Sequence, residues 1–121
     1  MPVYSQKRNR SMDMIGKRLK EARLSKNLTQ WQLAELIGVE GTGGNTRIAH
    51  YETERYSPSF HVARQLARVL SVPEYYFYIV DDTEAQLLLE RYQANQAKGK
   101  ITLHKLIFEI EDMLHILKKR L

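Results

Sequence analysis

The sequence predicts an all-α protein, with a bundle of five helices over residues 12–80 and a two-helix extension over residues 81–121. Apolar residues recur at intervals of three and four along both parts, which is the spacing of one helix face. Capping residues, glycines and prolines divide the chain into helix-length segments joined by short loops. Because no segment has the two-residue alternation of a strand, we expect helices packed on helices.

The N-terminal part consists of a polar arm and a first helix. Residues 1–11 are basic and show no apolar periodicity, so we expect a flexible arm. The first helix is predicted over residues 13–26, with Ile15, Leu19 and Ala22 on the face that points inward. Three basic residues fall on its other side and are expected in solvent: Lys17, Arg18 and Lys20.

The second helix begins at a capping box. Thr29 and Gln32 form the T-x-x-Q pattern, in which each side chain bonds a free backbone amide at the helix start. Leu33 and Ile37 continue at helical spacing. Gly38 is placed to end the helix in the left-handed conformation that glycine favours.

The third helix follows a glycine-rich turn. Ile48 and Tyr51 form its apolar stripe, so its polar residues are candidates for an exposed surface. These are Asn45, Thr46, Arg47 and His50. Two short helices joined by a turn are the layout of a helix-turn-helix, whose second helix enters the major groove of DNA.

Two more helices complete the predicted bundle. Ser57-Pro58-Ser59 marks the start of the fourth, because serine caps a helix and proline is tolerated in its first turn. Its inward face is formed by Val62, Leu66, Ala67 and Leu70. A short fifth helix begins at Val72-Pro73-Glu74 and ends in an aromatic run, residues 75–78.

The C-terminal extension is predicted as a hairpin of two helices. Asp81 and Glu84 form a second capping box, the helix runs to about Gln96, and Gly99 is expected to break it. The last helix carries a heptad row, which we name the seam: Leu103, Ile107, Ile110, Leu114, Leu117 and Leu121. The seam is expected to pair with a second copy of the chain; the alternative is that it folds back on the bundle as ordinary core.

The segment around the two short helices resembles the phage-repressor and Cro type (Xre-like) of helix-turn-helix transcription regulator. The signature of that family is T-Q-x-x-L-A-x-x-x-G-V, then a few polar residues, then I-x-x-[YWI]-E. Its positions fall here on Thr29-Gln30, Leu33-Ala34, Gly38-Val39, Ile48, Tyr51 and Glu52. The resemblance extends over residues 12–80 and implies a five-helix repressor-type DNA-binding fold.

One departure from the family concerns the turn. Eight residues, 40–47, stand between Val39 and Ile48, where the family usually has four. They include Gly41-Thr42-Gly43-Gly44, which either lengthens the turn or approaches DNA closely, as glycine permits. The run is not a nucleotide-binding loop, because the lysine and hydroxyl residue of that motif are absent.

The resemblance also implies roles for individual residues. Those expected to contact phosphates are Gln30, Trp31, Arg55 and Tyr56, together with Lys7, Arg8 and Arg10 of the arm. Trp31 has an alternative role, packing on the arm. Those expected to read bases are Asn45, Thr46, Arg47 and His50, with a surface histidine and a phosphate-only arginine as the alternatives. Arg23 is expected to pair with Glu52 and to fix the third helix to the scaffold.

Charge and composition favour a nucleic-acid partner and disfavour other classes. The net charge of +5 resides in residues 1–80, which hold 12 basic and 7 acidic side chains, against 7 and 7 in residues 81–121. There is no cysteine, apolar span or signal peptide, which indicates a cytoplasmic protein without disulfides. We expect no enzyme, cofactor or metal; the best metal candidate, His104, Glu111 and His115, has ordinary surface spacing.

The predicted function is a dimeric repressor that reads a pseudo-palindromic operator in double-stranded DNA. The alternative is an antitoxin or antagonist-controlled regulator whose C-terminal helices bind a different protein. RNA binding is disfavoured, because no sheet with a stacking platform is predicted.

Overall fold

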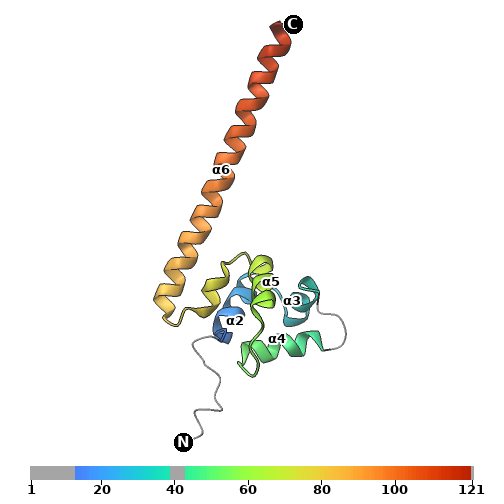
Figure 1. The fold of residues 1–121 in the computed structure, drawn as a ribbon, viewed down its shortest axis with the longest axis vertical. Coiled ribbons are helices and arrows are strands. Elements are labelled where there is room, and N and C mark those ends of the chain that lie inside the picture. The colour runs from blue at the N-terminus through green and yellow to red at the C-terminus, as the bar shows by residue number, and fades with distance from the viewer. Residues whose placement is uncertain (1–12, 39–42, 121) are drawn as a thin grey trace, which may run out of the picture. The chain divides into compact units, whose positions relative to one another are not determined.

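The computed structural model describes residues 13–38 and 43–120, and this part of the chain contains helices and no strand. The all-α fold class is therefore confirmed. The elements are α2 (Gly16–Ser25), α3 (Gln30–Leu36), α4 (Gly44–Glu52), α5 (Phe60–Leu70), the 3₁₀ helix η2 (Glu74–Tyr78) and α6 (Asp82–Arg120) (Figure 1). The chain divides into two compact units, Met1–Leu89 and Glu90–Leu121.

The core of the first unit is built from α2, α3, α4, α5 and η2. Its largest fully buried apolar side chains come from each of these helices: Leu19, Leu33, Ile48, Leu66, Leu70 and Phe77. All of the predicted inward positions on the second and third helices are buried, as the helical spacing required. Ile15 is an exception, because it precedes the first turn of α2 and is only half-buried, while Met14 beside it is buried.

Helix α2 begins at Gly16, three residues later than predicted. The preceding backbone is extended at Ile15, and its amides are bonded by distant groups rather than by a helix turn. Met14 N donates to Ser57 Oγ at 3.0 Å, Ile15 N to the Phe77 carbonyl at 2.8 Å, and Gly16 N to Glu54 Oε2 at 3.2 Å. These tertiary bonds satisfy the orphan donors of the helix start.

Gly16 also brings α2 against the end of α4. A Cβ atom built on Gly16 would collide with the carbonyl group of Glu52 and approach that of Tyr51 to 2.8 Å. Only a glycine lets the two backbones come this close. The last turn of α4 is therefore seated directly on the first turn of α2.

The predicted capping residues are found at the helix ends. Thr29 and Gln32 form the reciprocal capping box of α3, and Gly38, with φ +81°, follows its end in the left-handed region. The hydroxyl of Ser59 accepts from Val62 N at the start of α5. Asp81 Oδ1 accepts from Glu84 N at 2.8 Å at the start of α6.

The C-terminal extension differs from the prediction. Helix α6 runs from Asp82 to Arg120 without a break, so the expected hairpin with a turn at Gly99 is wrong. A single glycine costs a helix about 1 kcal/mol relative to alanine, which good helix formers on both sides offset. The Thr102 hydroxyl also donates to the Lys98 carbonyl across Gly99, at 3.0 Å. None of the helices in the described residues is long and apolar enough to cross a membrane.

Candidate nucleic-acid interface

Helix α4 presents polar side chains from its first turn. Gly44, Ile48 and Tyr51 are buried, and this inward row leaves the side chains between them facing away from the core. Asn45, Thr46 and Arg47 are exposed, and His50 is half-buried one turn after Thr46. Three of the four predicted base-reading residues are therefore accessible at the helix start, the end that enters the groove in a helix-turn-helix.

The inserted turn lies partly outside the described residues. Of its glycine-rich run, Gly43 and Gly44 are described, and α4 starts at Gly44, one residue before the predicted position. No heavy atom lies within 4 Å of a Cβ built on Gly43. Asn45 and Thr46 consequently belong to the first turn of α4 rather than to the loop.

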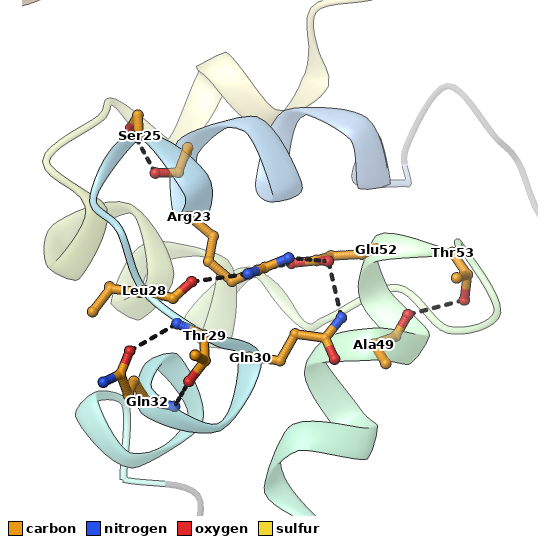
Figure 2. A network of polar contacts seen from close by, with 10 residues as sticks. Arg23, Ser25, Leu28, Thr29, Gln30, Gln32, Ala49, Glu52 and Thr53 are labelled. Atoms are coloured by element: carbon orange, nitrogen blue, oxygen red, sulfur yellow. Dashed lines mark hydrogen bonds and ion pairs between the residues drawn. The ribbon is translucent and has the colours of Figure 1, made fainter.

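The Arg23–Glu52 ion pair is present and nearly closed to solvent. Arg23 Nε lies 2.6 Å from Glu52 Oε2 and Nη2 lies 3.1 Å from Oε1, which is the bidentate geometry of an arginine with a carboxylate. The exposed fractions of the two side chains are 9% and 4%. Arg23 Nη1 also donates to the Leu28 carbonyl at 2.8 Å. The pair thus joins the end of α2, the loop before α3 and the end of α4 (Figure 2).

Gln30, the predicted phosphate anchor, belongs to the same network. Its amide Nε2 donates to Glu52 Oε1 at 3.1 Å, so one carboxylate orients both Arg23 and Gln30 (Figure 2). An amide nitrogen carries two hydrogens, and the bond to Glu52 occupies one of them. This bond was not predicted, because the family pattern gives Gln30 and Glu52 separate roles.

Trp31 lies beside Gln30 at the start of α3, with 58% of its surface exposed. A large indole with this exposure is not packed into the core of the described residues. The predicted alternative, packing on the basic arm, concerns residues outside the described part of the chain, as do the contacts proposed for Lys7, Arg8 and Arg10. Leu121 of the seam also lies outside it.

The loop after α4 brings three further side chains together. The amides of Arg55 and Tyr56 both donate to the carbonyl of His50, at 2.9 and 3.3 Å. The Tyr56 ring meets the His50 ring edge-on at 5.1 Å, and the Arg55 guanidinium lies 6.0 Å from the Tyr56 centroid. Arg55 and Tyr56 are exposed, so the predicted phosphate-contacting loop is accessible and held against α4.

Sequence reasoning missed two residues at the start of α5. Phe60 is exposed in the first turn, and the guanidinium of Arg64 lies 6.0 Å from its ring centroid. A sequence signal was available, since a phenylalanine directly after the Ser59 cap, with an arginine four residues on, lies off the apolar face of that helix.

The described residues hold no group of three or more histidine, cysteine, aspartate or glutamate side chains with metal-binding geometry. His104, Glu111 and His115 are exposed along the same helix.

Comparison with known proteins addresses the helical unit directly. Residues 16–80, from α2 to the residues before α6, match the model of the family described as helix-turn-helix domain. The chain belongs to the helix-turn-helix domain family. The match includes α3 and α4, the two helices that hold Gln30 and the exposed residues of the first turn.

A solved member of the regulators offers a longer comparison. The crystal structure of transcriptional regulator BswR is 34% identical to this chain, with a TM-score of 0.64. The alignment covers 75% of this chain and 94% of BswR. A comparison with curated proteins gave no significant match.

Proposed function

We propose that this chain is a sequence-specific, DNA-binding transcriptional regulator that acts as a dimeric repressor of the phage-repressor and Cro type. The observation that carries the proposal is the exposed polar first turn of α4, displayed above a buried face formed by Ile48 and Tyr51. A helix anchored in this way can enter the major groove with its first turn against the base edges. Membership of the helix-turn-helix family and the likeness to a transcriptional regulator support it.

The residue types on α4 suit the reading of base pairs. Asn45 can bond both the N6 and N7 positions of adenine, and Arg47 can bond O6 and N7 of guanine. The Thr46 methyl can contact the methyl group of thymine. His50, held by Tyr56, supplies a further donor one turn along the helix.

Phosphate contacts are proposed around this helix. Gln30 and Trp31 stand at the start of α3, where free amides and the helix dipole favour an anion. Arg55 and Tyr56 stand on the loop after α4, and the basic arm adds Lys7, Arg8 and Arg10. Together they place phosphate-binding groups on both sides of the reading helix in the sequence.

The dimer rests on the seam. Leu103, Ile107, Ile110, Leu114 and Leu117 are 45–57% exposed, although a heptad row of this kind is normally buried. In the described residues the unit Glu90–Leu121 consists of this helix alone, so the seam has no partner within its own unit. A second copy supplies an identical row, and two-fold pairing makes such a row self-complementary.

A two-fold dimer predicts the form of the operator. Two copies of α4 would enter successive major grooves about 34 Å apart and read a pseudo-palindrome. Binding would exclude polymerase from the same DNA and repress transcription. Affinity would fall steeply with salt concentration, because each neutralised phosphate releases counterions.

Selection of bound duplexes from a random library tests the proposal. The full chain should enrich a pseudo-palindrome, and Asn45→Ala or Arg47→Ala should each lose about 1–3 kcal/mol for that site with little loss on random DNA. Equal losses on both DNAs would contradict base reading by these residues. No enrichment of any duplex would overturn the proposed function.

The dimer is tested separately by sedimentation. Ile110→Lys places a charge in the seam and should give a monomer. Phe108→Lys is the matched control, because Phe108 is exposed on the same helix but lies outside the heptad row. A wild-type chain that sediments as a monomer, or that dimerises equally well with Ile110→Lys, would contradict the seam as the dimer interface and favour pairing with a different protein.

A further inference from the structure

Arg18 is buried although it was expected in solvent. It lies in the middle of α2 with 1% of its surface exposed, beside basic neighbours that remain exposed. The prediction treated it as one of three outward cations and is wrong for this residue. Because a buried guanidinium must be bonded on all sides, its partners identify what it holds.

The partners of Arg18 lie around the start of α6. Nε donates to the Ile79 carbonyl and Nη2 to the Val80 carbonyl, both at 3.0 Å. Nη1 lies 2.8 Å from Asp82 Oδ1. The two carbonyls belong to the extended linker after η2, and Asp82 is the first residue of α6. One side chain therefore bonds three points on four consecutive residues.

Other contacts hold the same segment to the first unit. Lys17 Nζ lies 2.8 Å from Asp82 Oδ2, so α2 bonds both carboxylate oxygens of Asp82. These bonds hold the pKa of the Asp82 carboxyl below its ordinary value. Ala85, one turn into α6, is 2% exposed, and Leu89 packs against the core. The first two turns of α6 are thus seated on the DNA-binding unit.

We propose that Arg18 is a positioning residue that fixes the root of α6 on α2 and so sets the half-site spacing that the dimer accepts. The inference rests on the proposed dimeric function. The guanidinium is planar and its donors have fixed directions, so three bonds to one short segment restrict both bending and rotation of that segment. Helix α6 continues without a break from Asp82 into the seam, so the seating of its first turn bears on the geometry of the paired chains.

The role is distinct from DNA contact. At 1% exposure Arg18 has no surface left for a phosphate, whereas Arg55 and Arg64 are exposed. Loss of the clamp should therefore leave the affinity for a single half-site unchanged. What should change is the penalty for half-sites moved closer together or further apart.

The test uses Asp82→Ala in the full chain. Asp82 is exposed, so its loss removes one arm of the clamp without a buried cavity. Glu84→Ala is the matched control, because Glu84 is also acidic, exposed and in the first turn of α6, and its side chain is not among the Arg18 partners. Asp82→Asn keeps an oxygen acceptor for Arg18 and should fall between wild type and Asp82→Ala.

Binding is measured on duplexes that carry the selected half-sites at the preferred spacing and at one or two base pairs more or less. Asp82→Ala should lower the discrimination between spacings by about three- to tenfold, the size of a lost bond to a charged group. Its half-site affinity and its sedimentation should match those of wild type and Glu84→Ala. Unchanged discrimination in Asp82→Ala would overturn the proposal, as would an equal change in Glu84→Ala.

Hydrogen exchange separates failure of the clamp from failure of the proposed function. Amides of residues 80–89 should exchange at least about threefold faster in Asp82→Ala than in Glu84→Ala, because the helix start is less firmly held. Unchanged exchange would show that the clamp does not hold α6 and would overturn the proposal on structural grounds. Faster exchange with no spacing preference in the wild-type chain would instead reject the dimeric function, and with it the assignment of spacing to Arg18.

Discussion

Removal of the Glu52 carboxylate is the most direct test of how α4 is held. In Glu52→Ala the Arg23 guanidinium loses two bonds, of 2.6 and 3.1 Å, and keeps only its bond to the Leu28 carbonyl. Arg23 is 91% buried as a side chain in the wild type, so the change leaves a charge largely without a counter-charge. Breaking a buried pair in this way costs about 3–5 kcal/mol.

We take the lower end, about 3 kcal/mol, because the alanine at position 52 opens a path for water to Arg23. For a domain of this size each kcal/mol lowers the midpoint of thermal unfolding by about 4–8 °C, so a fall of roughly 12–24 °C is expected. Circular dichroism at one fixed chain concentration measures it, since dimer formation makes the midpoint depend on concentration.

Glu35→Ala is the matched control for this experiment. Glu35 is exposed on α3, and its replacement should change the free energy of unfolding by less than about 0.5 kcal/mol. A midpoint in Glu52→Ala within a few degrees of the control would refute the reasoning, because it would mean that the pair contributes nothing that water does not replace.

The double variant Arg23→Leu/Glu52→Leu separates stability from positioning. Replacing both charges by apolar side chains removes the unpaired cation and should restore most of the lost stability. It does not restore the acceptor of Gln30, whose amide bonds Glu52 Oε1 at 3.1 Å in the wild type. DNA affinity should therefore stay lower than wild type while the melting midpoint recovers; full recovery of both would show that Gln30 needs no orientation by Glu52.

Three further changes have defined outcomes. Gly16→Ala forces a Cβ against the Glu52 carbonyl and should lower the free energy of unfolding by about 1–3 kcal/mol in urea titration, whereas Gly99→Ala, with open space around it, should not lower it. Arg55→Ala should reduce the slope of log K against log salt by about 1 and weaken binding equally on all duplexes; an unchanged slope would remove Arg55 from the phosphate contacts. Burial, together with the Glu21 carboxylate, raises the pKa of the Tyr76 hydroxyl. The unfolded chain therefore releases this proton first, so stability should fall as pH rises above about 10, and Tyr76→Phe should flatten that fall in unfolding measured from pH 8 to 11.

Features set by local sequence were predicted well. The capping box of Thr29 and Gln32, the Ser59 cap and the left-handed Gly38 each depend on residues within one helical turn, so the pattern alone determines them. The ends of α3, α4 and α5 followed from these signals together with the apolar spacing. The Arg23–Glu52 pair joins residues 29 positions apart and was expected only through the family resemblance.

Features set by distant partners were not predicted. Arg18 has the helical position of a surface cation, and nothing local shows that two carbonyls and a carboxylate more than 60 residues away surround it. The late start of α2 has the same origin, since the amides before it bond Ser57, Phe77 and Glu54. The break expected at Gly99 failed for the opposite reason: a glycine lowers helix propensity, but only a competing partner or a proline would have ended the helix there.

The contacts that hold α4 and the residues proposed to read DNA lie at opposite ends of that helix. The scaffold grips its last turn, through the backbone of Tyr51 and Glu52 against Gly16 and through the carboxylate of Glu52. The proposed readers begin at Asn45, in the first turn, where the side chains are exposed. A substitution in the first turn therefore disturbs no contact that positions the helix, whereas a substitution in the last turn disturbs both folding and aim. This separation explains how the inserted turn before α4 is compatible with an intact fold, since the added residues enter at the end of the helix that the core does not clamp through Glu52.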